Sequence, residues 1–294
     1  MGANLYMGTM DNTQPGTMPT GIISLDSVLK GGFPAGSFVL LIGEIGAGNT
    51  DFAYTSVLSL LEIQQNGYPT DSFRNTVLPD KICYMSLTRN WEDVHDEISR
   101  CFPEDLCAIS DRIEFKDFSD EYFSKSSIPT GWINDSPVSF NSLKEMKYEK
   151  DLINGMVVYL DENAPNSAIV IDSITALAEY CASPSNSTEW SDVISFFRGL
   201  QRVAKKWNGM VYALLTTDIV DKQQQEQIAD CADGVLIFEW DDFGASKRQR
   251  VMHVKKFRGL LPQLEMANLV KFETSVTTDY GFAISKVKQV GWHA

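Results

Sequence analysis

Short apolar runs alternate along the chain with longer segments in which apolar residues recur every three or four positions. A short continuous apolar run indicates a strand buried on both faces, and the wider spacing indicates an amphipathic helix. Because strands and helices alternate, the pattern predicts an α/β fold with a mainly parallel central sheet and helices on both faces. Strands are predicted at residues 38–42, 81–87, 112–118, 168–172, 210–216, 232–239 and 250–257, helices at 50–66, 91–100, 143–163 and 189–207, and a turn at 241–246.

The rest of the pattern predicts a single domain over residues 19–294, because no internal repeat is present. Residues 1–18 are polar and form a lead-in to this domain. Segment 19–32 predicts a short amphipathic helix, with Ser24 as its N-cap. Residues 119–143 are rich in Ser, Pro, Gly and Asn, which predicts a long loop or insertion. A loop of that length is unusual inside a compact domain and is often functional.

The charge of the chain limits its partners. The formal net charge is −14 over 294 residues, whereas proteins that bind nucleic acids present clustered lysine and arginine to the phosphates. We therefore expect no dedicated nucleic-acid binding. The densest basic run is Lys247-Arg248-Gln249-Arg250, followed by Lys255, Lys256 and Arg258. This run is either a set of solvated charges on two strands and a turn, or a functional patch.

Composition also predicts the compartment. No stretch approaches the ~20 apolar residues that a membrane-spanning helix requires, and the N-terminus lacks the basic and apolar parts of a signal peptide. The five cysteines form no C-x-x-C pair, which predicts neither a zinc site nor a disulfide framework. Reduced thiols fit a cytoplasmic protein without membrane insertion. Trp91 and Trp132 are predicted to be packing residues.

The strongest chemical motif is a phosphate-binding loop with one substitution. The strand at 38–42 runs into Gly43-x-x-x-x-Gly48-x-Thr50, and a predicted helix follows. Such a loop holds phosphate with backbone N–H groups, a helix N-terminus and one lysine ammonium, but Asn49 stands at the lysine position. On the motif alone, a simple glycine turn between strand and helix is the alternative. The candidate nucleotide-binding residues are Gly43, Glu44, Ile45, Gly46, Ala47, Gly48, Asn49 and Thr50.

A second motif supports the first. Asp172 ends the apolar strand at 168–172, as the Mg²⁺-associated aspartate of a P-loop ATPase does. The alternative is an aspartate that caps a following helix. If a nucleotide binds, Thr50 and Asp172 are the expected Mg²⁺ residues.

Together these motifs resemble the KaiC-like branch of the RecA superfamily of P-loop ATPases over residues 17–290. The resemblance implies a RecA-like fold in which strand 211–215 lies between strands 38–42 and 168–172. It also implies that Thr217 lies at the nucleotide site, and that Lys256 and Arg258 reach a neighbouring subunit's nucleotide. The matching segments are Pro19-Thr-Gly-Ile-x-x-Leu-Asp-x-x-Leu-x-Gly-Gly, Pro34-x-Gly36-Ser, Val170-Ile-Asp-Ser173-Ile-Thr175, Leu214-Leu-Thr-Thr217, Ile228-Ala-Asp-Cys-Ala-Asp-Gly-Val235 and Val254-Lys-Lys-Phe-Arg-Gly259.

The chain departs from the family at the residues that drive hydrolysis. The family carries two adjacent acids after its second strand, and one of them polarises the attacking water. Thr88 and Arg89 occupy these positions here, and neither acts as a general base at neutral pH. Arg89 either points into the site, where it replaces part of the lost lysine charge or pairs with Glu44 or Asp172, or faces solvent.

These departures predict a degenerate member of the family without efficient ATP hydrolysis. We expect a regulatory or scaffold subunit, either nucleotide-free or binding ATP or ADP with Mg²⁺ more weakly than its relatives. Its expected partner is a second copy or a related KaiC-like subunit. Two alternatives stay open: a slow but genuine ATPase with Glu92 or Glu44 as the base, and a recombinase paralogue acting on DNA.

Overall fold

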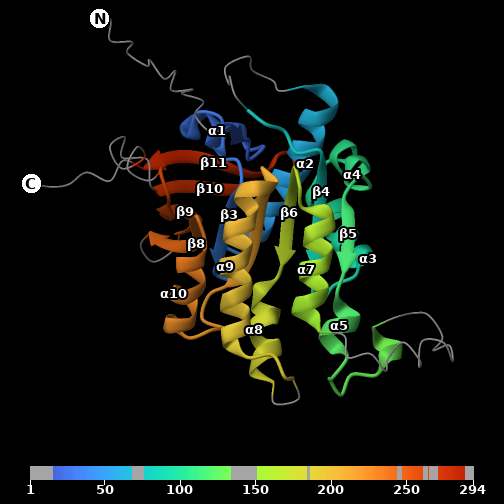
Figure 1. The fold of residues 1–294 in the computed structure, drawn as a ribbon. Helices are drawn as coiled ribbons and strands as arrows, with labels where there is room; N and C mark the ends of the chain where they lie inside the picture. The colour runs from blue at the N-terminus through green and yellow to red at the C-terminus, as the bar shows by residue number, and fades with distance from the viewer. Residues whose placement is uncertain are drawn as a thin grey trace, which may run out of the picture.

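A nine-stranded sheet forms the centre of the molecule in a computed structural model, which describes residues 16–67, 76–133, 151–183, 186–243, 247–260, 264 and 271–288 (Figure 1). The strand order is β11-β10-β9-β8-β3-β7-β6-β4-β5. Strand β7 therefore separates β3 from β6, and the predicted placement of 211–215 between 38–42 and 168–172 is confirmed. The strands are β3 (Ser37–Gly43), β4 (Lys81–Ser86), β5 (Glu114–Asp117), β6 (Ser167–Asp172), β7 (Met210–Thr216), β8 (Gly234–Phe243), β9 (Lys247–Phe257), β10 (Lys271–Thr277) and β11 (Gly281–Lys288).

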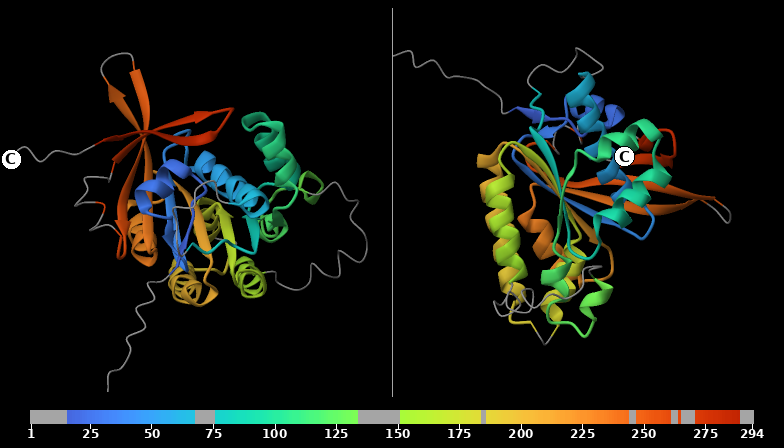
Figure 2. Two further views of the ribbon diagram at one scale, coloured as in Figure 1. Left: turned by 90° about the horizontal axis from the view of Figure 1, so that it is seen from above. Right: turned by 90° about the vertical axis from the view of Figure 1, so that its right-hand side faces the viewer.

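The sheet is parallel from β5 to β8 and antiparallel from β8 to β11. Its parallel strands end at one edge, so the residues that follow β3, β6 and β7 meet there. The antiparallel strands, orange to red, form one side of the molecule (Figure 2). A second, two-stranded sheet pairs β1 (Thr17–Met18) with β2 (Phe33–Pro34).

Helices cover both faces of the sheet, as the alternating pattern predicts (Figure 1). One apolar core lies between α2 and α3 and side chains such as Val39 and Tyr84. The other lies between α7, α8 and α9 and side chains such as Leu40 and Ile171. The helices are α1 (Ile23–Leu29), α2 (Asn49–Asn66), α3 (Trp91–Cys101), α4 (Glu104–Ser110), α5 (Ser119–Phe123), α7 (Leu152–Asn163), α8 (Ile174–Ala182), α9 (Trp190–Trp207) and α10 (Lys222–Cys231), with a 3-10 turn η1 at Thr130–Trp132.

The start of α1 corrects the sequence prediction. Ser24 lies inside the helix, and the N-cap is Ile22, which forms no side-chain capping bond. The local hydrogen bonds come instead from the buried carboxylate of Asp26, which accepts from the N–H of Thr20 at 2.7 Å, from its hydroxyl at 2.7 Å and from the N–H of Gly21 at 3.1 Å. Part of the Pro19-to-Gly32 motif is therefore structural.

Two further predictions were wrong. A turn is predicted at 241–246, but Asp241, Asp242 and Phe243 belong to β8 and pair with β9, where Asp242 faces Arg248 at 3.6 Å. Positions 244–246 lie outside the described residues. Trp132 is 79% exposed and does not pack, whereas Trp91 packs against Phe115 with ring centroids 5.4 Å apart.

Several predicted segments lie partly outside the described residues. These are the lead-in up to residue 15, the end of the 119–143 segment from 134 on, and the first eight positions of the helix predicted from 143. The described part of the 119–143 segment forms α5 and η1. None of the described helices is long and apolar enough to cross a lipid bilayer.

Candidate functional site

The phosphate loop joins the buried strand β3 to helix α2 at the edge where the parallel strands end. Gly48 precedes the helix with φ of 109°, a conformation that glycine adopts without steric cost. The N–H of Glu44 donates to the carbonyl of Phe238 on β8 at 3.0 Å, and the N–H of Thr217 donates to the carbonyl of Gly43 at 3.0 Å. Hydrogen bonds to both neighbouring strands thus fix the base of the loop.

Asn49 folds back across the end of β3. A Cβ atom built on Gly43 would lie 2.4 Å from Cγ of Asn49, so the amide lies directly against the glycine. Position 43 needs glycine for this contact. Thr50, in the first turn of α2, is half-buried. The loop therefore keeps its backbone and its hydroxyl, but Asn49 brings no charge to it.

The C-terminal strand β11 returns to the helix that follows the loop. The N–H of Phe282 donates to Oγ1 of Thr55 at 2.8 Å. Its ring packs edge-on against Phe52 at 5.3 Å, and a Cβ atom on Gly48 would meet the same ring at 3.4 Å. The last described strand thus closes one side of the phosphate loop.

The β8–β9 hairpin covers the outer side of the loop, which sequence analysis did not predict. The indole Nε1 of Trp240 donates to the carbonyl of Ile45 at 3.2 Å, and its backbone N–H donates to the carboxylate of Glu44 at 3.3 Å. Nε of Arg250 donates to the carbonyl of Gly46 at 2.9 Å. The basic run at 247–250 was the available signal, but the contact itself depends on the strand register.

Asp172 ends β6 beside the end of β4, because Ser86 and Asp172 are partners in the parallel ladder. The hydroxyl of Tyr84 donates to Oδ2 of Asp172 at 2.6 Å, and Nη1 of Arg89 lies 4.0 Å from the same oxygen. Burial raises the pKa of Asp172, and Tyr84 and Arg89 partly offset that rise. Burial and the neighbouring Asp172 raise the pKa of Tyr84, so its hydroxyl keeps its proton and donates.

Arg89 points inward, toward Asp172, and does not pair with Glu44. Its Nη1 donates to the hydroxyl of Tyr54 at 3.0 Å and its Nη2 to the carboxylate of Glu97 at 2.6 Å, while Tyr54 also donates to Glu97 at 3.0 Å. Residue 88, the other expected acid position, carries an exposed threonine. At position 89, where the family resemblance predicts an acid, the structure therefore has a cation within a closed hydrogen-bond network.

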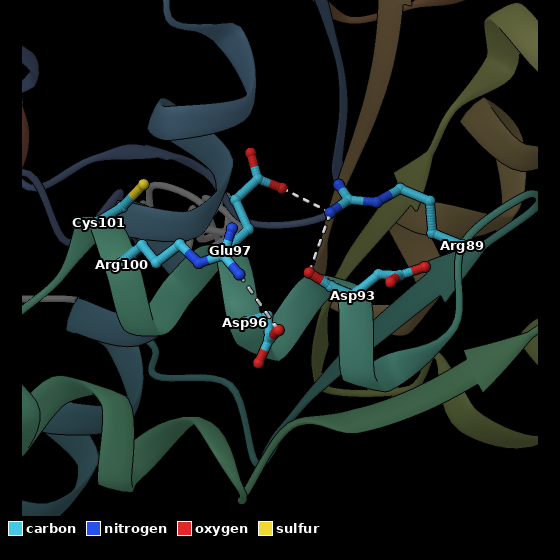
Figure 3. Close-up of a pocket in the computed structure, with 6 residues that line it drawn as sticks. All are labelled: Arg89, Asp93, Asp96, Glu97, Arg100 and Cys101. Carbon is cyan, nitrogen blue, oxygen red and sulfur yellow. Dashed lines mark hydrogen bonds and ion pairs between the residues drawn. The ribbon is translucent and has the colours of Figure 1, made fainter.

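A cavity of about 440 Å³ lies beside this network and runs along α3 (Figure 3). Charged side chains of both signs line it, and an ion pair joins Arg100 to Asp96 at 3.5 Å. No group of three or more potential metal ligands gathers anywhere in the described ranges. The lining residues are Arg89, Asp93, Asp96, Glu97, Arg100 and Cys101.

Lys256 and Arg258 lie near the strand ends opposite to those that carry the phosphate loop of the same chain. Lys256 pairs with Val235 at the start of β8, whereas Gly43 pairs with Phe238 farther along the strand. Nζ of Lys256 donates to the carbonyls of Ala229 and Asp230, both at 2.9 Å. Arg258 donates to the carbonyl of Asp230 at 3.3 Å.

Within their own chain, these two cations cap the C-terminus of α10. Lysine and arginine at a helix C-terminus complement its partial negative charge. Burial and the charge of Arg258 lower the pKa of Lys256. A contact with a neighbouring subunit stays a prediction.

Comparisons with solved structures identify proteins with a similar fold. At the level of sequence, no protein-family model and no curated protein matches the chain. A solved KaiC-like protein from the hyperthermophilic archaeon Pyrococcus horikoshii is 16% identical, with a TM-score of 0.55 over 93% of this chain and 100% of that one. The flagellar accessory protein FlaH from Methanocaldococcus jannaschii is also 16% identical, with a TM-score of 0.56 over 90% of this chain and 96% of that one. The chain thus has the RecA-like fold of the KaiC-like proteins, which the sequence motifs predict.

Proposed function

We propose that this chain is a KaiC-like protein that has lost efficient ATP hydrolysis and works as a regulatory or scaffold subunit. The observation that carries the proposal is the position of Arg89. Its guanidinium, which stays protonated at any physiological pH, stands where the family resemblance predicts an acid, and it lies 4.0 Å from Asp172.

Hydrolysis by a P-loop ATPase requires three elements around the phosphates. A lysine and Mg²⁺ neutralise the phosphate oxygens, and a polar or acidic group positions the attacking water. Asn49 replaces the lysine, and Arg89 replaces the acid. Thr50 and Asp172 would hold the Mg²⁺ ion, which in this family neutralises charge on the nucleotide phosphates. Here Asp172 already accepts a hydrogen bond from Tyr84 and faces the guanidinium of Arg89, so Arg89 disfavours a metal ion at this carboxylate.

The loop itself supports retained but weakened binding of ATP or ADP. Its backbone and the N-terminus of α2 are preserved, and only one charged donor is missing. The loss of one charge-assisted hydrogen bond costs roughly 1.5–3 kcal/mol, which is about ten- to a hundredfold in affinity. The Asn49→Lys variant should therefore bind nucleotide more tightly than the parent and still fail to hydrolyse it.

Phosphate release from ATP in the presence of Mg²⁺ tests the proposal. The parent protein and its Asp172→Asn variant should release phosphate at the same background rate. Activity should require the triple change Asn49→Lys, Thr88→Glu and Arg89→Glu. Turnover by the parent that disappears in Asp172→Asn would refute the proposal.

The slow ATPase is the alternative outcome of this assay, and the structure supports neither of its expected bases. Glu92 is exposed in the first turn of α3. The carboxylate of Glu44 accepts from the backbone of Trp240 on the outer side of the loop. Glu92→Gln and Glu44→Gln variants should therefore leave any residual rate unchanged.

A non-hydrolysing subunit acts through what it binds, and we propose self-association or pairing with a related KaiC-like subunit. The segment that includes Lys256 and Arg258 is the proposed contact surface. FlaH, one of the similar structures, is described as an accessory protein, and a supporting role of this kind suits a chain without turnover. All five cysteines are free, which supports a reducing, cytoplasmic location.

Sedimentation velocity tests the proposed assembly. The parent should sediment as an oligomer at high concentration, and a Lys256→Ala/Arg258→Ala variant should shift toward monomer. Lys255→Ala is the matched control, because Lys255 is exposed on the same strand and pairs with Glu226 instead of capping α10. A parent that stays monomeric with and without nucleotide would end this part of the proposal.

A further inference from the structure

The outer side of the phosphate loop is held by one cross-strand pair of the β8–β9 hairpin. Trp240 and Arg250 are direct partners in the antiparallel register, and the guanidinium carbon of Arg250 lies 4.5 Å from the centroid of the Trp240 ring. Each donates to the loop, Trp240 to the carbonyl of Ile45 and Arg250 to that of Gly46. A stacked, hydrogen-bonded guanidinium has lost most of its rotational freedom before any ligand arrives.

Arg248 offers an internal comparison. Its guanidinium carbon also lies over the Trp240 ring, at 4.6 Å, but its ion pair is with Asp242 at 3.6 Å. Among the residues that the structure describes, Arg248 forms no hydrogen bond to the loop. Two arginines of the same basic run thus share one aromatic ring, and only one of them touches the phosphate loop.

The loop and the start of α2 carry no positive charge of their own. Glu44 lies in the loop and Asp51 in the first turn of α2, while Asn49 is neutral. Across the described ranges, Arg250 is the one lysine or arginine that hydrogen-bonds to residues 43–50. The charge of Arg250 also lowers the pKa of Asp51 against the effect of burial, so its field reaches the start of the helix.

The hydrogen-bonding groups of Arg250 are only partly used. Its Nε donates to Gly46, but the two Nη groups have no hydrogen-bond partner, and no carboxylate lies within 4.0 Å, among the residues that the structure describes. A guanidinium has five N–H donors arranged as a fork that matches phosphate oxygens. Arg250 therefore has donors left for an anion at the loop.

We propose that Arg250, held in place by Trp240, supplies the positive charge that Asn49 lacks, so that the loop binds a nucleoside di- or triphosphate through a cation from β9. This inference rests on the proposed function, because it concerns the same loop. It assigns the basic run of the sequence a role in binding, and it explains how a loop without its lysine keeps a phosphate ligand. The cation approaches from the outer side of the loop and not from the helix.

Isothermal titration of ATP and of ADP into the purified full chain tests the inference. Arg250→Ala should weaken binding roughly ten- to a hundredfold, the effect of one charge-assisted hydrogen bond. Arg248→Ala, the matched control, removes a cation from the same ring and should weaken binding less than about threefold, as a screened charge does. Thermal melts should show that both variants remain folded.

A rescue variant separates the charge of Arg250 from its effect on loop shape. Asn49→Lys in the Arg250→Ala background restores a cation without restoring the hairpin contact, so it should recover most of the lost affinity. The gain from Asn49→Lys should also be larger in this background than in the parent. Equal gains in the two backgrounds, or no recovery, would mean that Arg250 only shapes the loop, and would overturn the inference.

The outcomes also separate the inference from the proposed function. If the parent hydrolyses ATP, the proposed function fails, and the affinities of the variants still decide the role of Arg250. If the parent binds neither nucleotide, or if Arg250→Ala and Arg248→Ala bind equally well, the inference fails. The proposal that the chain does not hydrolyse ATP then still stands.

Discussion

The pairing of Arg89 with Asp172 is best tested by removing the guanidinium and keeping the bulk of the side chain. Arg89→Met deletes the donors that reach Tyr54, Glu97 and Asp172. Tyr54 keeps its own hydrogen bond to Glu97. The two carboxylates are what lose a partner, and Asp172 is the more buried of them.

The expected cost follows from the exposure of each pair. The Glu97 side chain is 42% exposed, so its ion pair contributes about 0.5–1 kcal/mol. The Asp172 side chain is only 14% exposed, and two unit charges 4 Å apart interact by ~4 kcal/mol at an effective dielectric constant of 20. Because Arg89 is itself 31% exposed and solvent screens it, we take about 1–3 kcal/mol for this pair. The total of about 1.5–4 kcal/mol corresponds, at about 2.1 cal/mol/K of unfolding entropy per residue, to a melting temperature lower by roughly 2–7 °C.

The loss of stability caused by Arg89→Met should increase with pH. The pKa of Asp172 is raised in the folded protein, and Arg89 limits that rise, so Arg89→Met raises this pKa further. An acid whose folded pKa lies above its unfolded value of 3.8 lowers stability as pH rises from that value through the folded pKa. The difference in unfolding free energy between parent and Arg89→Met should therefore be larger at pH 8 than at pH 4.5.

Urea unfolding at the two pH values measures this difference, and Arg100→Met is the control. Arg100 lines the same cavity but is 79% exposed, and its ion pair with Asp96 should contribute less than about 1 kcal/mol at either pH. The double variant Arg89→Met/Asp172→Asn should be destabilised by less than the sum of the single changes. If Arg89→Met costs no more than Arg100→Met, or costs the same at both pH values, the pairing with Asp172 is wrong.

Two further predictions concern residues that shape the site from outside. Asp26→Ala should lower the unfolding free energy by at least about 3 kcal/mol in urea titrations, because three donors from Thr20 and Gly21 lose a buried carboxylate; Asp26→Asn should recover part of it, and a cost below 1 kcal/mol would contradict this role. Gly281→Ala should lower the melting temperature in calorimetry, since a Cβ atom would lie 2.4 Å from both Phe102 and Thr55 at a φ of 64°, and an unchanged melting temperature would contradict the tight approach of β11 to α2.

The sequence predicts the centre of the fold better than its edge. Strands β3, β6 and β7 are buried on both faces, so each appears as a continuous apolar run. Their order comes from the family resemblance and not from the pattern. Strands β10 and β11 are not predicted, because residues such as Lys271 and Glu273 alternate with buried ones and the apolar signal is weak.

The candidate site also contains parts that local motifs predict and parts that depend on long-range packing. The frame from Gly43 to Thr50 and the position of Asp172 follow from local motifs. The orientation of Arg89 depends on Tyr54 and Glu97, which come from two different helices, and the sequence leaves it open. The contacts of Trp240 and Arg250 with the loop join residues 195 and 204 positions apart, so only the register of the folded sheet reveals them.

The contact between Phe282 and the helix after the phosphate loop has a consequence for how the protein is made. The two partners of this hydrogen bond, Thr55 and Phe282, are 227 residues apart. At a synthesis rate of roughly 5–20 residues per second, the ring that packs on Gly48 leaves the ribosome about 10–45 s after the loop itself. During that interval the loop lacks the contact that Phe282 makes on one side, so its surroundings in a nascent chain differ from those in the finished protein.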